Sequence, residues 1–200
     1  MSFMTAAQAR LYIPSMTGSG SDTDLDALIG RLHRVFAWYL GFQPATAGAN
    51  PVITATNYTQ YMTANGGVEL RLPYLPVQSI GSIYDDADRV YGASTLVASG
   101  DYDLHGDTGL VILKSTASHG EWSSAHRAIK VTFNAGFSSV PGAIVHAGGI
   151  QMAHIWAGRN YVGKKNVSQG GASMTVADLQ LLPEVKESLA PYRMPSAFIG

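Results

Sequence analysis

The spacing of apolar residues changes twice along this chain, and this change restricts the fold more than any other feature of the sequence. Between residues 22 and 42 apolar side chains recur at steps of three and four, the spacing of an amphipathic helix. Between residues 50 and 137 they alternate with polar residues as in strands, and after residue 139 the helical spacing returns. We therefore expect an α+β fold, in which a helical bundle from the N- and C-terminal parts carries an inserted small antiparallel β-sheet. The expected parts of this single domain (1–200) are N-terminal helices (1–42), a β insert (50–137), C-terminal helices (139–190) and an extended C-terminal tail (191–200).

Two helices are expected in the N-terminal part. Residues 1–13 predict a short helix that Pro14 closes. The second helix is expected to begin where Asp22 or Thr23 caps it, because a short polar side chain there accepts a hydrogen bond from a free N–H group. Gly41 is expected to end this helix, since glycine readily takes the left-handed conformation of a helix end.

The β insert contains several short segments with the alternation of half-buried strands. Gly66-Gly67 predicts a turn, and DYDLHGDTGLVIL predicts a hairpin with its turn from Gly106 to Gly109. We expect one antiparallel sheet of about six strands. The other expected strands are 52–54, 57–62, 68–72, 79–84 and 128–133, the last with Ile129, Val131 and Phe133 on one face.

The C-terminal part begins with an apolar helix whose expected start is Pro141. It is apolar on nearly every side, which predicts a buried helix, and its Gly148-Gly149 pair lets another element approach closely. Residues 163–173 predict a mobile loop. Residues 175–188 predict a last helix, broken or restarted at Pro183.

Composition excludes several classes of protein and site. The chain has 200 residues, no cysteine, a net charge of -1 and only 14% charged residues. It therefore lacks a disulfide framework, a thiolate zinc site and a cysteine nucleophile. The near-neutral charge argues against tight nucleic-acid binding, and we expect neither a signal peptide nor a membrane span. A surface so poor in charge favours an oligomer or an assembly component.

Two segments that resemble binding motifs indicate ordinary structure instead. GRNYVGKK (158–165) has the spacing of a phosphate-binding loop, but Lys165 stands where Ser or Thr must hold magnesium. DYDLHGDTG (101–109) begins like a calcium loop, but His105 replaces an oxygen ligand and Ile112 replaces the bidentate glutamate. We expect a helix end with two solvated lysines and a hairpin turn.

Candidate metal-binding and catalytic side chains are few and scattered. His119, Glu121 and His126 are close in sequence, in a Ser/Gly-rich loop with no further strong ligand nearby. No nucleophile elbow, zinc-protease motif or dinucleotide fingerprint occurs, so we expect no catalytic residue, no metal and no cofactor. Structural roles are expected for His33 and His154 at the edge of the core and for Asp85, Asp86 and Asp88 in a solvated turn.

The last residues, LAPYRMPSAFIG (189–200), are unusually apolar for the end of a chain, where small polar residues are the norm. They carry two prolines together with Tyr192, Met194, Phe198 and Ile199. Two interpretations follow. Either this tail folds back on its own core, or it inserts into the groove of a partner.

The order of these segments resembles that of the head–tail connector (adaptor) proteins of long-tailed bacteriophages and gene transfer agent particles. The β insert is larger than in the smallest connectors of this family, which are all-helical. The matching pieces span roughly residues 20 to 194 and are SDTDLDALIGRLHRVFAWYLGF, LRLPYLPVQSIGSIYDD, DYDLHGDTGLVIL, IKVTFNAGFSSVPGAI and LLPEVKESLAPYR.

The resemblance implies a structural protein of the virion, made in the host cytoplasm and located at the capsid–tail junction. Connectors of this family form a dodecameric ring below the portal protein. The ring extends the channel through which DNA passes without sequence-specific binding, and its lower face meets the next connector, a stopper or a tail protein. The resemblance implies neither an enzyme activity nor a cofactor nor a membrane partner.

In the family, the segment after the last helix docks into the portal protein. Carried over to this chain, the portal-binding residues are Tyr192, Arg193, Met194, Phe198 and Ile199, with Arg193 as a polar anchor and Phe198 and Ile199 as apolar anchors. A ring would also repeat Lys164 and Lys165 into a positive collar that meets DNA or a neighbouring subunit.

Two functions from other classes stay open at this point. The tyrosines and Trp122 suggest a β-rich ligand- or carbohydrate-binding module. The dispersed acidic residues suggest a small hydrolase. A ring of many copies with a central hole separates a connector from both.

Overall fold

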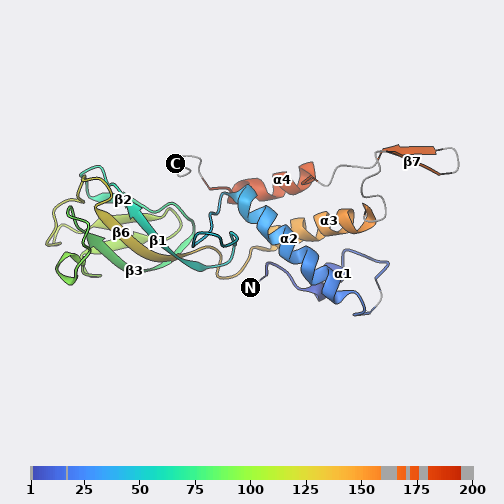
Figure 1. Ribbon diagram of the computed structural model, residues 1–200, viewed down its shortest axis with the longest axis horizontal. Coiled ribbons are helices and arrows are strands. Elements are labelled where there is room, and N and C mark those ends of the chain that lie inside the picture. Colours follow the sequence, from blue (N-terminus) through green and yellow to red (C-terminus); the bar gives the residue numbers. More distant parts are fainter. Residues whose placement is uncertain (1, 17, 159–165, 170–171, 176–179, 195–200) are drawn as a thin grey trace. The chain divides into compact units, whose positions relative to one another are not determined.

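The computed structural model describes residues 2–16, 18–158, 166–169, 172–175 and 180–194. The chain divides into two compact units (Figure 1). Unit 1 comprises Met1–Phe36 and Val140–Arg193, and unit 2 comprises Ala37–Ser139 and Met194–Gly200. The chain therefore crosses between the units three times, after Phe36, after Ser139 and after Arg193. Helices and antiparallel sheets together confirm the predicted α+β class, whereas the packing of the helices as one bundle stays a prediction.

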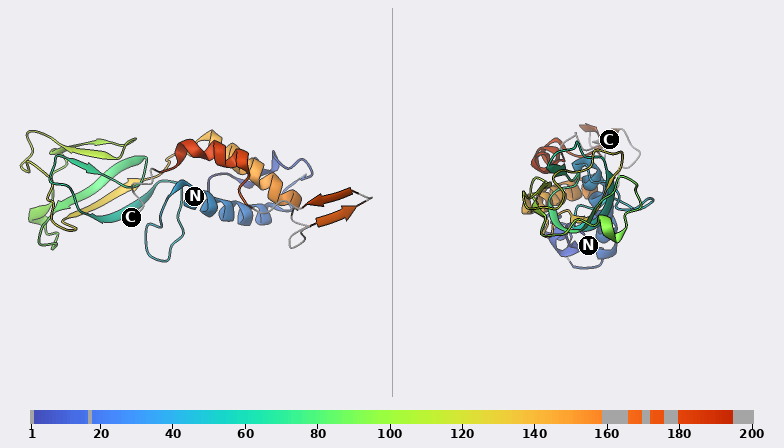
Figure 2. Two further views of the ribbon diagram at one scale, coloured as in Figure 1. Left: turned by 90° about the horizontal axis from the view of Figure 1, so that it is seen from above. Right: turned by 90° about the vertical axis from the view of Figure 1, so that its left-hand side faces the viewer.

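The helices all belong at least in part to unit 1. They are α1 (Ala6–Arg10), α2 (Asp22–Leu40), α3 (Gly142–Gly158) and α4 (Pro183–Leu189), which the 3₁₀ turn η3 (Ala190–Tyr192) continues. Unit 1 also contains an antiparallel pair, β7 (Asn166–Gln169) and β8 (Ala172–Thr175), drawn as two arrows in Figure 2.

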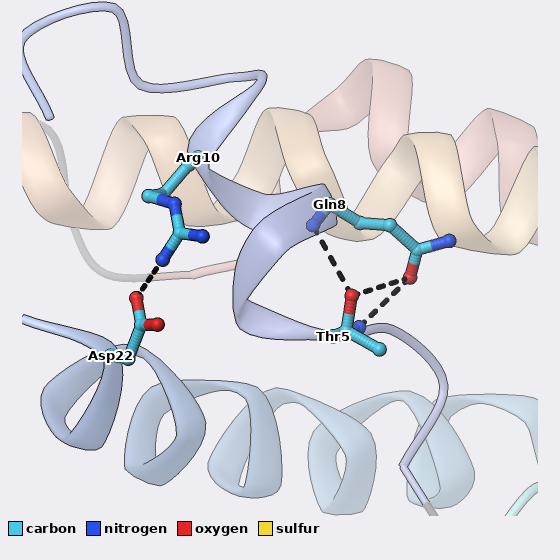
Figure 3. A network of polar contacts seen from close by, with 4 residues as sticks. All are labelled: Thr5, Gln8, Arg10 and Asp22. Carbon is cyan, nitrogen blue, oxygen red and sulfur yellow. Dashed lines mark hydrogen bonds and ion pairs between the residues drawn. The ribbon is translucent and has the colours of Figure 1, made fainter. Parts of the chain in front are cut away.

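Helix α1 is shorter than the helix predicted over residues 1–13. The hydroxyl of Thr5 accepts a hydrogen bond from the Gln8 N–H (3.2 Å), and the Gln8 side chain accepts one from the Thr5 N–H (2.8 Å; Figure 3). This reciprocal capping box fixes the start of the helix at Ala6. Arg10 ends it and forms an ion pair with Asp22 at the beginning of α2.

Helix α2 ends where the sequence predicted, before Gly41, whereas the predicted cap Asp22 is already its first helical residue. Gly41 follows it with a φ of 92°, its N–H donates to the Trp38 carbonyl (3.1 Å), and the Phe42 N–H donates to the Ala37 carbonyl (2.9 Å). These two bonds form a Schellman motif, which satisfies carbonyls that the helix leaves free. Its buried apolar stripe consists of Leu25, Ile29, Leu32, Phe36, Ala37 and Leu40.

Helix α3 is buried on one face, so the prediction of burial on nearly every side is wrong. Gly142, Ala143 and His146 are exposed, because neighbouring elements cover only the opposite side. The predicted close approach at Gly148-Gly149 is confirmed. A Cβ atom on Gly148 would lie 2.1 Å from the Phe3 ring, and one on Gly149 would lie 2.4 Å from the Tyr12 ring.

Helix α4 lies along α3 and is positioned by one buried amide. Gln151 is 0% exposed; its side chain donates to the Gln180 carbonyl (3.2 Å) and accepts from the Leu182 N–H (2.9 Å). The helix begins at Pro183, as the predicted restart requires. The predicted helical start at Thr175 is wrong, because this residue ends β8. The described part of the loop predicted over 163–173 forms strands.

The described part of unit 2 contains six strands, but they form two sheets where the sequence predicted one. In the first sheet β6 is the central strand and pairs with β1 on one side and β3 on the other. The other strands pair among themselves in the order β2-β5-β4. The strands are β1 (Thr56–Met62), β2 (Glu69–Arg71), β3 (Val77–Asp85), β4 (Tyr102–His105), β5 (Leu110–Leu113) and β6 (Ile129–Ala135), with the 3₁₀ turn η1 (Ala93–Thr95) after β3.

The local strand signals are largely confirmed. The β4–β5 hairpin turns between His105 and Leu110, as its glycines predicted, and the alternation in β6 buries Ile129, Val131 and Phe133. The segment 52–54 is not a strand, since only an isolated bridge joins Thr54 to Phe137. Both sheets bury their inner faces in one hydrophobic cluster, in which the rings of Tyr58, Tyr74 and Phe133 pack together.

His33 gives unit 1 an expected acid sensitivity. It lies on α2, 5% exposed, with its ring centroid 6.0 Å from that of Phe3, and burial lowers its pKa from 6.5 to about 4. Between these pH values the unfolded chain binds a proton that the folded chain excludes, so stability falls as the pH drops from about 6.5 to 4. We expect urea unfolding to show a loss of up to about 3 kcal/mol over this range. His33→Leu should remove that part of the pH dependence; an identical slope in both proteins would contradict the assignment.

Candidate interaction surfaces

The root of the C-terminal tail is bound to its own chain. Met194 is 9% exposed and belongs to unit 2. Its N–H donates to the Leu40 carbonyl (2.8 Å), and its sulfur accepts a hydrogen bond from the Leu75 N–H (3.4 Å). Met194 is therefore an intramolecular anchor. This agrees with a tail that folds back on its own core, for Met194 alone.

The other residues proposed for portal docking are placed only in part. Tyr192 is half-buried in η3, and Arg193 is exposed in extended backbone after it. Phe198 and Ile199, and the proposed collar residues Lys164 and Lys165, lie outside the described residues. The roles proposed for these residues therefore stay predictions.

Sequence reasoning missed a loop that a single carboxylate organises. Asp86, expected in a solvated turn, is 7% exposed, and its side chain accepts hydrogen bonds from the N–H groups of Asp88 (2.9 Å), Val90 (3.0 Å) and Tyr91 (2.6 Å). Arg89 and Tyr91 have positive φ angles of 61° and 55°. Such angles are uncommon outside glycine, so the carboxylate holds a backbone that the sequence alone would not favour.

This loop presents an apolar side chain beside a cluster of rings and cations. Val90 is 79% exposed at its tip. Tyr91 donates its hydroxyl hydrogen to the Arg127 carbonyl (2.6 Å), and its ring centroid lies 5.4 Å from that of Tyr61. Arg127 lies over the Tyr61 ring (5.1 Å), and Lys130 lies over the Tyr91 ring (5.4 Å). A rigid loop with an exposed apolar tip is suited to contact a protein partner, because little ordering remains to be done on binding.

The order of this loop should depend on the charge of Asp86. The N–H of Tyr91, with those of its neighbours, lowers the pKa of the Asp86 carboxyl below its usual range. The stabilisation is therefore present above the ordinary aspartate pKa and is lost as the pH falls through the lowered value. We expect Asp86→Ala to speed amide exchange at Asp88, Val90 and Tyr91, measured by hydrogen exchange. Asp88→Ala, whose carboxylate is exposed, is the matched control.

The candidate metal ligands His119, Glu121 and His126 form no ready metal site in the described part of the chain. Residues 159–165 of the segment that resembles a phosphate-binding loop lie outside the described residues. Among the described residues no group of three His, Asp or Glu side chains is placed to hold a metal ion. The hydroxyl of Ser118 joins His119 (3.2 Å) to Asp101 (3.1 Å) in an exposed polar contact. Trp122, the main support for a carbohydrate-binding module, is 0% exposed and donates to the Val68 carbonyl, so its ring is not available to a sugar. No helix in the described part of the chain has the length and hydropathy of a membrane span.

Comparisons with known proteins identify the fold. No protein-family model matches the sequence, and no curated protein matches it. A solved structure of the neck of an empty GTA (gene transfer agent) particle, computed with C6 symmetry, aligns with a TM-score of 0.57 and 19% identity, over 96% of this chain and 90% of that chain. The neck of a native GTA particle, computed with C12 symmetry, aligns with a TM-score of 0.52 and 19% identity, over 84% of this chain and 82% of that chain. The resemblance drawn from the sequence is thus confirmed at the level of the fold.

Proposed function

We propose that this chain is a structural, non-enzymatic protein of the neck of a phage-like or gene transfer agent particle. In this role it forms a ring below the portal protein, extends the DNA channel and joins the capsid to the tail. The observation that carries the proposal is the fold shared with GTA neck chains, which spans 96% of this chain and so includes residues of both units. An isolated binding module of the β type would not require the helical unit.

The symmetry of the neck structures supports an assembly of many copies. One was computed with C6 and the other with C12 symmetry, and a dodecameric ring satisfies both because a twelvefold axis contains a sixfold one. The low content of charged residues, 14%, also suits a chain whose surface is covered by neighbours. We propose the portal protein on one side of the ring and a further connector, stopper or tail protein on the other.

Electron microscopy of the purified protein, and of the particle that contains it, tests this proposal. The expected result is a ring with a central hole at the head–tail junction. Rings close when one face of a subunit meets a different face of its neighbour. A symmetric two-fold dimer as the sole assembly, in solution and in the particle, would contradict the proposal.

Docking of the tail into the portal protein is the second part of the proposal. Because Met194 is anchored in its own chain, docking falls to Phe198 and Ile199, together with Arg193 before the anchor. We expect removal of residues 195–200 to leave the melting temperature unchanged and to abolish capture by the portal protein of the same particle. Phe198→Ala should weaken capture most among single changes, by about 2 kcal/mol, since buried aromatic anchors dominate such contacts.

A second truncation separates the tail from its root. Ending the chain at Ala190 removes Met194 as well, and burial of a methionine side chain is worth about 2 kcal/mol or more. The melting temperature should therefore fall by roughly 5 °C. If removal of residues 195–200 lowers it equally, the tail belongs to the core of its own chain, and the docking proposal fails.

The lysine collar is the third part. Lys164 and Lys165, repeated in a ring, would face DNA in the channel or a neighbouring subunit. Replacing both with Gln should leave ring formation unchanged while altering the salt dependence of DNA retention in the particle.

A further inference from the structure

Helix α2 carries an outward-facing stripe that no described part of its own copy covers. Leu25, Ile29, Leu32 and Phe36 face the core, whereas Arg31 and Arg34 are exposed, Val35 is 45% exposed and Trp38 is 54% exposed. The spacing from Arg31 to Arg34 to Trp38 is three and then four residues, so these side chains lie on one face of the helix. Tryptophan and arginine are the residues that most often dominate the energy of protein interfaces. We call the exposed residues Arg31, Arg34, Val35 and Trp38 the α2 stripe.

Helix α4 presents a matching stripe of the opposite charge. Val185 and Leu189 are buried, whereas Glu184, Glu187 and Pro191 are exposed on α4 and on η3, which continues it. The spacing from Glu184 to Glu187 to Pro191 is again three and then four residues. We call these three exposed residues the α4 stripe.

Among the described residues, the charges of both stripes form no ion pair within their own copy. The ion pairs formed among the described residues are Arg10–Asp22 and Lys114–Asp103. Arg31, Arg34, Glu184 and Glu187 take part in neither. The arginines of the α2 stripe therefore do not pair with the glutamates of the α4 stripe in the same subunit.

The two stripes fit each other in one parallel register. Placing Arg31 level with Glu184 brings Arg34 level with Glu187 and Trp38 level with Pro191, because an α-helix rises by the same 1.5 Å or so per residue in both. The wider rise of the 3₁₀ turn shifts the last pair by only about 1 Å. Two ion pairs would then lie on one side of the contact between an indole and a proline ring, which forms the apolar end of the interface.

We propose that the α2 stripe of one copy packs in parallel on the α4 stripe of the next copy and forms the subunit contact of the ring. The proposal rests on the proposed function, to which it adds the surfaces that meet. The two stripes differ, so the contact is heterologous and repeats around an axis, whereas a contact between identical stripes would stop at a dimer. The occupant is a second copy because the chain itself supplies the complementary charge in the complementary spacing.

Disulfide trapping tests the register directly, since the chain has no cysteine of its own. In the proposed register Val35 lies level with Ser188. The double variant Val35→Cys, Ser188→Cys, oxidised in the purified full-length protein, should give a ladder of covalent oligomers on a non-reducing gel. Trapping accumulates transient contacts, so a protein that is monomeric at equilibrium still gives a result. Each single variant should stop at a dimer. The matched control, Val35→Cys with Ser99→Cys in an exposed loop of unit 2, should give no ladder beyond the dimer.

Charge reversal tests the ion pairs in the same background. Arg31→Glu with Arg34→Glu should reduce the ladder at least about tenfold, because like charges would then face each other across the contact. Adding Glu184→Arg and Glu187→Arg should restore it. Thermal melts of each variant check that the fold survives, since arginine in the first turn of α4 opposes the helix dipole.

The outcomes separate this contact from the proposed function. No ladder, an equal ladder from the control pair, or no restoration by the compensating charges would overturn the contact, even if microscopy shows a ring. A particle whose neck lacks this protein, with the ladder and its rescue intact, would overturn the proposed function and leave the contact standing. Arginine reversal that spares the ladder but lowers DNA retention would overturn the contact and assign the α2 stripe to nucleic acid.

Discussion

Replacing Trp122 with alanine should destabilise unit 2 more than any other single truncation in it. The indole is 0% exposed, its N–H donates to the Val68 carbonyl (3.0 Å), and it belongs to the cluster that both sheets share. Removing a buried aromatic side chain costs about 3–5 kcal/mol. The expected result is a fall in melting temperature of roughly 10 °C or more, measured by circular dichroism or calorimetry.

Two controls accompany the Trp122 variant. Trp122→Phe keeps most of the buried volume and loses the bond to Val68, so about 1–2 kcal/mol should be lost. Leu96→Ala removes an apolar side chain that is 46% exposed in the same unit and should change stability by about 0.5 kcal/mol or less. An alanine variant of Trp122 as stable as the Leu96 variant would show that the indole is not part of the core.

Introducing valine at Gly148 should strongly destabilise unit 1. A Cβ atom there would lie 2.1 Å from the Phe3 ring, and Phe3 is buried against Phe36, with ring centroids 5.4 Å apart. Overpacking of this kind costs typically about 1–3 kcal/mol, and the branched side chain should place Gly148→Val at the upper end. Urea unfolding measures the loss, and Gly148→Ala should fall between the variant and the natural protein.

Gly30 provides the opposite expectation in the neighbouring helix. A Cβ atom at Gly30 would meet nothing within 4 Å, so Gly30→Ala should stabilise α2 by about 1 kcal/mol.

A second variant tests the cause of the Gly148→Val penalty. Removing the opposing ring with Phe3→Ala should remove most of the loss of stability that Gly148→Val causes. If the penalty is the same in both backgrounds, its cause is not the contact with Phe3.

Features encoded by neighbouring residues could be predicted from the sequence. The end of α2 depends on Gly41, the turn of the β4–β5 hairpin depends on Gly106 and Gly109, and the buried face of β6 follows from strict alternation. The close approach at Gly148 was predicted as well. What approaches it, Phe3 from the N-terminal segment, was not, because nothing in the glycine pair names its partner.

Features that depend on distant residues could not be predicted. The division into two sheets depends on which strands pair, and β6 pairs with β1 and β3, which both lie far before it in sequence. Trp122 suggested a ligand-binding surface, because the sequence does not show that its indole is buried and bonded to Val68, 54 residues away. Asp86 is a local exception: the three N–H groups that it binds lie within five residues, but its burial and the positive φ angles of Arg89 and Tyr91 become visible only in the structure.

The path of the chain between the units has a mechanical consequence. A domain attached by one linker transmits tension through one backbone strand, and a single proteolytic cut frees it. Here two internal backbone strands connect unit 1 with unit 2, after Phe36 and after Ser139, and the first of them runs inside a helix. The third crossing, after Arg193, leads to the chain end, where Met194 is held by hydrogen bonds. A pull on either unit is therefore divided between two backbones, and one cut in either of them leaves both units tethered.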